Sequence, residues 1–125
     1  MKKILIVDDD QTVRDSFSEL LKGKYELSIF SDGYQAYTEL TTGETDVDLF
    51  LLDINLPGQM TGIRLLEEIR QMTQFKNTPV LIVSSSLTKD HIEHVNSLDL
   101  TSYSLKPVDK KVFLNVVENL IKLNK

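Results

Sequence analysis

The sequence predicts a doubly wound α/β fold in which five parallel strands form one sheet with helices on both faces. Short runs rich in leucine and β-branched residues alternate along the chain with longer stretches whose apolar residues recur at helical spacing. Several of the short runs are apolar almost throughout, which is typical of central strands in a parallel sheet covered on both faces. Right-handed crossovers between such strands then give the strand order 2-1-3-4-5.

The predicted strands differ in how completely apolar they are. Residues 3–7, 48–53 and 79–84 are the continuous apolar runs, so we expect them to be the central strands. Residues 26–30 and 102–106 alternate more between polar and apolar side chains, which is typical of strands at the edges of a sheet. The predicted sheet therefore has three buried strands and two edge strands.

The amphipathic stretches between and after these strands are predicted to be helices. Each has apolar residues three or four positions apart, and each follows a residue whose side chain can cap a helix N-terminus. The predicted helices are 11–22, 33–42, 62–73, 89–97 and 109–123, with N-caps at Asp10, Asp32, Thr61, Thr88 and Asp109.

Length and composition indicate one compact domain. The chain has 125 residues, of which 41% are hydrophobic, and this is enough for one hydrophobic core. We therefore expect a single domain over residues 1–125. Its 19 acidic and 14 basic residues give a formal net charge of -5. The basic residues are scattered and not gathered in one segment, so we expect no direct binding to nucleic acid.

The sequence also limits where the protein works. The absence of cysteine excludes disulfide bonds and thiolate metal sites and fits a reducing compartment. The chain begins with lysines and a short apolar run, but acidic residues follow too soon for a signal peptide. No apolar stretch has the length of a membrane span. We therefore expect a cytoplasmic protein that makes no membrane contact.

Charged and polar residues stand where the predicted strands end. The first strand is followed by Asp8 and Asp9, the third ends at Asp53, the fourth at Ser84, and the fifth at Lys106. Ligands of open α/β sheets bind at the carboxyl ends of the strands, near the point where the strand order reverses. The sequence therefore predicts that three carboxylates, a hydroxyl and an ammonium group converge there.

These residue types together favour phosphoryl chemistry assisted by a cation. Crowded carboxylates repel one another unless a cation neutralises them, and Mg²⁺ prefers oxygen ligands such as carboxylates and a backbone carbonyl. Asn55 lies two residues beyond Asp53, where its carbonyl could face the ion. With the charge offset, Asp53 can act as a nucleophile toward phosphorus, while Lys106 stabilises charge on the transferred group and Ser84 donates a hydrogen bond to it.

Four sequence motifs carry a family resemblance that covers essentially the whole chain. They stand in order at the ends of the first, third, fourth and fifth predicted strands, and they read ILIVDDD (4–10), LLDINLPG (51–58), PVLIVSSS (79–86) and YSLKPVD (103–109). With them the chain resembles the receiver domain of the two-component response-regulator family. The resemblance implies the flavodoxin-like (βα)5 version of the predicted fold.

The resemblance also implies a role for each site residue. Asp53 would be the phosphoacceptor, and Ser84 and Lys106 would be the switch hydroxyl and the phosphate-binding lysine. The metal ligands would be Asp8, Asp9, Asp53 and the backbone carbonyl of Asn55, holding Mg²⁺, for which Mn²⁺ can substitute. The protein would be a signalling module that catalyses only its own phosphorylation and dephosphorylation.

A switch and two kinds of partner are implied as well. Tyr103 matches the family's switch aromatic residue, which turns inward as Ser84 moves toward the phosphoryl group. This movement would change the surface formed by the fourth helix, the fifth strand and the fifth helix. The phosphoryl group would come from a histidine kinase or a histidine phosphotransfer protein, and the changed surface would signal to a downstream protein that the sequence does not identify.

The sequence departs from the common family pattern in three places. Gly62 stands nine residues after Asp53, which makes the intervening loop one residue longer than usual and is expected to change a kinase-facing surface. Ser84 replaces the commoner threonine and lacks the β-methyl group that stiffens χ1, so the switch could be looser. Asp99 and Leu100 replace a usual Gly-Ala pair, which is expected to alter the output surface.

Single residues at these positions have simpler interpretations. Asp8 and Asp9 could merely help to cap a helix, Asp53 could be an ordinary turn residue, and Tyr103 could pack at the edge of the sheet. Together the four motifs make these readings improbable for Asp8, Asp9 and Asp53, whereas for Tyr103 edge packing and a switch role both stay open. The two histidines at 91 and 94 could bind a metal ion, but a solvated helix face is favoured because no third ligand is evident.

Some features of the sequence suit functions other than phosphorylation. The longer 57–62 loop and Asp99 would suit an interaction module that works without phosphorylation. A flavin mononucleotide carrier is disfavoured because acids, not hydroxyls, follow the first strand. A phosphohydrolase is disfavoured because Asn55 stands where a second acid would be needed. The sequence is either a stand-alone receiver, which Met1 favours, or part of a longer chain.

Overall fold

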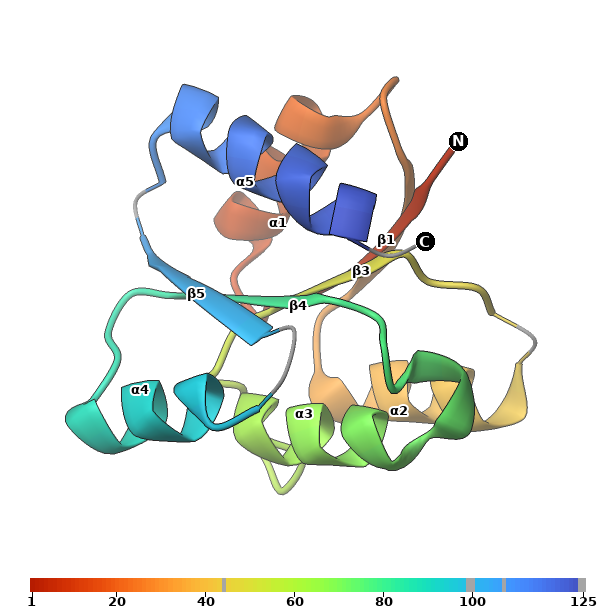
Figure 1. Cartoon of the computed structure of the whole chain (residues 1–125), viewed down its shortest axis with the longest axis vertical. Helices are drawn as coiled ribbons and strands as arrows, with labels where there is room; N and C mark the ends of the chain where they lie inside the picture. The colour runs from red at the N-terminus through yellow and green to blue at the C-terminus, as the bar shows by residue number, and fades with distance from the viewer. Residues whose placement is uncertain (44, 99–100, 107, 124–125) are drawn as a thin grey trace.

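The computed structural model describes residues 1–43, 45–98, 101–106 and 108–123, and it contains one five-stranded parallel sheet (Figure 1). The observed strand order, β2-β1-β3-β4-β5, confirms the predicted order and places β2 and β5 at the edges. The strands are β1 (Lys3–Val7), β2 (Glu26–Phe30), β3 (Leu49–Leu52), β4 (Val80–Ser84) and β5 (Thr101–Leu105).

The helices cover both faces of the sheet, as predicted. In Figure 1, α1 and α5 lie on one side of the sheet, and α2, α3 and α4 lie on the other. The helices are α1 (Gln11–Leu21), α2 (Gly33–Thr42), α3 (Gly62–Gln71), α4 (Lys89–Asn96) and α5 (Lys110–Leu123), with a short 3-10 helix, η1 (Thr73–Phe75). Among the described residues, no helix is long and apolar enough to cross a membrane.

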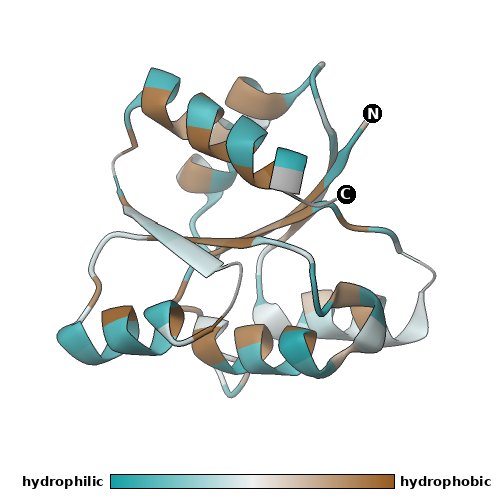
Figure 2. Ribbon diagram, viewed as in Figure 1, coloured by the Kyte–Doolittle hydropathy of each residue, from teal (hydrophilic) through white to brown (hydrophobic). Residues whose placement is uncertain are grey.

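Alternate residues of each central strand build two separate apolar clusters. Ile4 and Ile6 of β1 face the cluster beneath α1 and α5, whereas Leu5 and Val7 face the cluster beneath α2, α3 and α4. These side chains are at most 1% exposed, and burying each one contributes roughly 1.5–3 kcal/mol. The central strands are therefore hydrophobic along their length, while β5 is much less so (Figure 2). Packing on both faces holds the ends of the central strands firmly in place.

Several element boundaries differ slightly from the predicted ones. The third strand ends at Leu52 instead of residue 53, and the fifth ends at Leu105 instead of residue 106. The predicted helix 62–73 ends at Gln71, after which η1 forms a separate turn that packs Phe75 edge-on against Phe50, with ring centroids 5.2 Å apart. Asp53 and Lys106 consequently lie just beyond their strands. Asp99, Leu100 and Pro107 lie outside the described residues.

All five predicted N-caps accept a hydrogen bond from the first turn of their helices. The cap at Thr88 is a capping box, which was not predicted. The Thr88 side chain accepts from the N–H of His91, and His91 Nδ1 in turn accepts a hydrogen bond from the backbone N–H of Thr88 at 3.3 Å. A capping oxygen satisfies an N–H group that has no partner within the helix. The capping pairs are Asp10 with Thr12, Asp32 with Gln35, Thr61 with Arg64, Thr88 with His91, and Asp109 with Val112.

The guanidinium group of Arg70 ties α3 to the start of β5. Its Nη1 donates to the carbonyl oxygens of Phe75 and Thr78, at 3.1 and 2.6 Å, and its Nη2 donates to Thr101 Oγ1 at 3.4 Å. The spacing of residues in the predicted helix 62–73 gives no signal for these contacts. Charge-assisted hydrogen bonds of this kind hold the amino end of an edge strand in register.

The longer loop after β3 is anchored on the α2 side of the sheet. Gly58 provides its tight turn with a φ of 83°, a conformation that glycine adopts without strain. Met60 packs against the apolar cluster beneath α2, and its carbonyl lies so close to Gly33 that a Cβ there would be 2.5 Å away. The loop therefore has a packed anchor at Met60 and is not simply an exposed turn.

Replacing Gly62 with alanine is expected to destabilise the fold. A Cβ at Gly62 would collide with the carbonyl oxygen of Asp53 and would lie 2.5 Å from Ile54 Cα. Because backbone atoms cannot rotate away, we expect Gly62→Ala to lower the free energy of unfolding by about 2 kcal/mol or more, measured by urea titration. The control, Gly58→Asn, points into open space and tolerates positive φ, so it should cost clearly less. Equal losses in the two variants would contradict the proposed crowding.

Candidate functional site

Three acidic side chains meet where β1 and β3 end. One carboxylate oxygen each from Asp8, Asp9 and Asp53 can be chosen so that all lie within 4.8 Å of one another. The register of the two strands brings them together, since Val7 pairs with Leu52, Asp8 and Asp53 follow these two residues directly, and Asp9 follows Asp8. Asp8 is 1% exposed and Asp53 is 6% exposed, whereas Asp9 is exposed. The site therefore has a buried acidic floor that opens to solvent at Asp9.

Lys106 brings a positive charge to this acidic cluster from the other side of β4. Its Nζ donates to Asp8 Oδ2 at 2.7 Å and to Asp53 Oδ2 at 3.2 Å. Its own backbone N–H donates to the carbonyl oxygen of Ser84 at 2.8 Å, which fixes the start of the loop after β5. The ammonium group therefore sits between the two buried carboxylates.

The backbone orients both buried carboxylates. Asp8 Oδ1 accepts a hydrogen bond from the N–H of Asp10, and Asp53 Oδ1 accepts one from the N–H of Asn55, both at 3.0 Å. Each carboxylate thus has one oxygen held by the backbone and the other facing Lys106. Hydrogen bonds of this kind also stabilise the ionised form of a carboxylate.

The lysine does not fully offset the acids. Burial raises the pKa of Asp8 and the charge of Asp53 raises it further, while the hydrogen bonds from Lys106 and Asp10 oppose this, and the pKa stays above its ordinary value. Burial would lower the pKa of Lys106, but the hydrogen bond to Asp8 and the charges of Asp53 and Asp8 outweigh it and raise that pKa. Lys106 is therefore protonated, and its single positive charge faces the three acidic side chains of the cluster.

Ser84 lies at the end of β4 with its side chain fully buried. Its Oγ accepts a hydrogen bond from Asn55 Nδ2 at 2.9 Å and donates one to the carbonyl oxygen of Ser86 at 3.1 Å. The hydroxyl is thus engaged by the loops that follow β3 and β4. Tyr103 lies on β5 opposite Ile82, and its side chain is 41% exposed at the surface.

Among the described residues, the three acids are the group of histidine and acidic side chains that could hold a metal ion. The histidine pair considered in the sequence analysis does not join such a group. Instead, His91 caps α4, and His94 Nε2 lies 3.7 Å from Glu67 Oε2 of α3. Both histidines are half-buried, so they do not lie on the fully solvated helix face that was expected.

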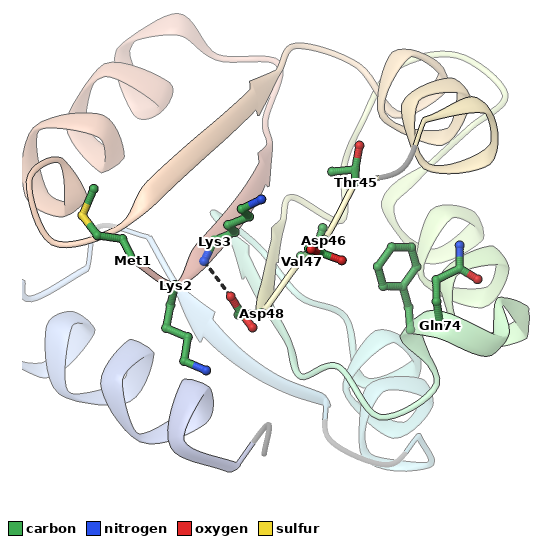
Figure 3. Close-up of a pocket in the computed structure, with 9 residues that line it drawn as sticks. Met1, Lys2, Lys3, Thr45, Asp46, Val47, Asp48 and Gln74 are labelled. Atoms are coloured by element: carbon green, nitrogen blue, oxygen red, sulfur yellow. Dashed lines mark hydrogen bonds between the residues drawn. The ribbon is translucent and has the colours of Figure 1, made fainter.

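A separate hollow of about 620 Å³ lies at the amino ends of β1 and β3 (Figure 3). Its lining includes Lys2, Lys3, Asp46 and Asp48, and the backbone N–H of Lys3 donates to Asp48 Oδ2 at 2.7 Å. The acidic cluster is at the carboxyl ends of the same strands, so the hollow lies at the opposite edge of the sheet.

Comparison with known proteins identifies the family. Residues 4–118 match the family model for the response regulator receiver domain. The chain belongs to this family. The chemotaxis protein CheY of Pseudomonas aeruginosa is 34% identical to the receiver over 120 residues, which are 94% of each chain. Two further relatives, the two-component response regulator-like PRR37 of Oryza sativa and the sensor histidine kinase CheAY of Helicobacter pylori, are much longer. The receiver spans only 16% and 15% of their length.

Two solved structures resemble the receiver and bear on its site. The phosphorylated cyanobacterial phytochrome response regulator RcpA has a TM-score of 0.81 and 27% identity, with 98% of this chain and 93% of that chain covered. The Mn²⁺-bound form of response regulator Rcp1 has a TM-score of 0.80 and 29% identity, with 96% and 91% covered. The receiver therefore shares its fold with regulators described as phosphorylated and as metal-bound.

Two hydrogen bonds around the charged groups of the receiver site were not predicted from the sequence. Arg14 was not singled out, yet its Nη1 donates to the backbone carbonyl of Asp8 at 2.7 Å and so connects α1 to the site. The hydrogen bond from the Asn55 side chain to Ser84 was also missed. Neither contact has a signal in residue spacing, because each joins a side chain to a loop whose path is set by the fold.

Proposed function

We propose that this receiver domain accepts a phosphoryl group on Asp53 and changes its surface in response. The observation that carries the proposal is the position of Lys106 Nζ between the carboxylates of Asp8 and Asp53, at 2.7 and 3.2 Å. A buried carboxylate beside a fixed ammonium group suits a nucleophile whose product carries added negative charge. The donor is a histidine kinase or a histidine phosphotransfer protein.

In the transfer step, a carboxylate oxygen of Asp53 attacks the phosphorus atom of the donor's phosphohistidine. A P–O bond forms while the P–N bond breaks, and the electron pair of that bond stays on the imidazole nitrogen. Lys106, held protonated by its acidic neighbours, stabilises the charge on the equatorial phosphoryl oxygens. The product is an acyl phosphate on Asp53.

The donor set of the site fits a hard divalent cation. Asp8, Asp9 and Asp53 supply carboxylate oxygens, and we assign the backbone carbonyl of Asn55 as a further ligand of Mg²⁺, for which Mn²⁺ can substitute. Bound Mg²⁺ would neutralise part of the charge on the transferring phosphoryl group. The exposed position of Asp9 gives the ion a route from solvent.

The response to phosphorylation involves Ser84 and Tyr103. We assign Ser84 as the hydroxyl that moves to donate a hydrogen bond to the phosphoryl group and Tyr103 as the side chain that turns inward. These residues belong to the neighbouring strands β4 and β5, which are paired in parallel register. Their movement would change the surface of α4, β5 and α5, where a downstream protein in the cytoplasm would bind.

Phosphorylation by a small-molecule donor tests this function. With phosphoramidate and Mg²⁺, we expect the intact mass to increase by one phosphoryl group and the adduct to be removed by hydroxylamine, as an acyl phosphate should be. Chelation of the metal with EDTA should slow the reaction at least about tenfold, because three carboxylates then repel the incoming phosphate. No adduct, or an adduct formed equally fast in EDTA, would count against the proposal.

A further inference from the structure

The hydroxyl group of Ser84 is held in a small ring of hydrogen bonds. Asn55 Nδ2 donates to Ser84 Oγ at 2.9 Å, and Ser84 Oγ donates to the carbonyl oxygen of Ser86 at 3.1 Å. Asn55 Nδ2 also donates to that same carbonyl oxygen at 3.4 Å. The ring joins the loop after β3 to the loop after β4, right beside the phosphoacceptor position.

The ring leaves the hydroxyl without a proton to donate elsewhere. A serine hydroxyl has a single O–H donor, and here it is directed at the carbonyl of Ser86. The amide of Asn55 fills an acceptor position of the same oxygen and so favours this rotamer. Ser84 lacks the β-methyl group that would restrict its χ1 angle, so the rotamer depends on these partners.

We propose that Asn55 is a positioning residue that holds Ser84 in a resting orientation, and that activation of the receiver must turn the Ser84 hydroxyl away from the Ser86 carbonyl against the hydrogen bond from Asn55. This inference rests on the proposed function, in which Ser84 donates to the phosphoryl group. Through its side chain, Asn55 thereby sets how readily the receiver reaches the phosphorylated state. This role is separate from the metal-binding role assigned to its backbone carbonyl. Removal of the amide should favour the active orientation of Ser84.

Binding of beryllofluoride, a mimic of the phosphoryl group, tests the inference. With Mg²⁺ present, we expect Asn55→Ala to bind beryllofluoride about fivefold more tightly than the wild type, followed by NMR titration of backbone amides. This fold-change corresponds to about 1 kcal/mol, the usual net value of one hydrogen bond. Ser86→Ala is the matched control. The ring uses the backbone carbonyl of Ser86, which this variant keeps, so the affinity of Ser86→Ala for beryllofluoride should equal that of the wild type.

A double-mutant cycle separates a resting-state restraint from a general change in the loop. In the Ser84→Ala background there is no hydroxyl to restrain, so adding Asn55→Ala should change beryllofluoride affinity by less than about twofold. Unchanged or weaker binding in Asn55→Ala alone would overturn the inference. A gain that persists in the Ser84→Ala background would also overturn it, since the effect would then bypass the hydroxyl.

The same titrations distinguish failure of the inference from failure of the proposed function. If the wild-type protein binds beryllofluoride and Asp53→Asn does not, the proposed function stands and the Asn55 variants decide the inference. If the wild-type protein does not bind beryllofluoride in the presence of Mg²⁺, the proposed function is wrong and the inference falls with it.

Discussion

Asp53→Asn is expected to abolish the hydroxylamine-labile adduct formed with phosphoramidate and Mg²⁺, a loss of at least about a hundredfold in rate. The asparagine side chain is uncharged and lacks the carboxylate oxygen that attacks phosphorus. It keeps the shape of the residue, and its carbonyl can still accept the hydrogen bond from the N–H of Asn55, which is 3.0 Å in the native chain. Intact mass spectrometry over a time course measures the effect.

Asp46→Asn is the matched control for this substitution. Asp46 is an exposed acid that lines the hollow at the opposite edge of the sheet, so its loss removes the same charge without touching the site. We expect phosphorylation of Asp46→Asn to proceed at the wild-type rate. An adduct that survives in Asp53→Asn would identify a different acceptor and contradict the proposed role of Asp53.

Lys106→Met is expected to slow phosphorylation by roughly 10²–10³-fold, which is the usual cost of losing a group that stabilises developing negative charge. Methionine fills similar space but leaves Asp8 and Asp53 without the ammonium group that now contacts both. The phosphoramidate reaction with Mg²⁺ again provides the measurement. Lys24→Met, an exposed lysine between α1 and β2, is the control and should react normally.

The same substitution should also affect stability in a pH-dependent manner. In metal-free buffer at pH 7.5, Lys106→Met should unfold more easily than the wild type by about 2 kcal/mol, because two buried acids lose their cation. The pKa of Asp8 is already raised in the folded protein, mainly by burial, so the folded state takes up a proton there before the unfolded state does. The loss should therefore shrink as the pH falls toward that pKa. Urea titrations at several pH values measure it, and a loss that grows on acidification would contradict this account.

The meeting of acidic residues at one edge of the sheet could be predicted from the sequence, because it follows from the order of the apolar strands. Continuous apolar runs identify buried parallel strands, and the carboxyl ends of such strands must meet at one edge of the sheet. Asp8 and Asp53 could therefore be grouped from the strand pattern alone, whereas Lys106 follows an alternating edge strand and was grouped with them because that strand is predicted to be parallel too. The N-caps were predictable for a similar reason, since a cap and its helix are neighbours in sequence.

The remaining features depend on side-chain paths that sequence spacing does not specify. Arg70 lies half-buried near the end of α3, and only the folded path of η1 and β5 supplies the oxygens that its guanidinium group binds. His91 was expected on a solvated face, yet its ring completes the cap of α4. The hydrogen bond between Asn55 and Ser84 joins the loop after β3 to the end of β4, and the two residues are 29 positions apart. Such contacts require the rotamers and loop shapes of the finished fold.

The contact between Lys106 and Asp8 joins residues that are 98 positions apart in the chain. During synthesis from the amino terminus, the three acids therefore appear well before the lysine that partly balances them. A nascent chain that stops short of β5 carries an acidic cluster with no ammonium group to assist phosphoryl transfer. Under the proposed function, competence to accept a phosphoryl group and completion of the sheet would coincide, so incompletely folded copies would be poor acceptors.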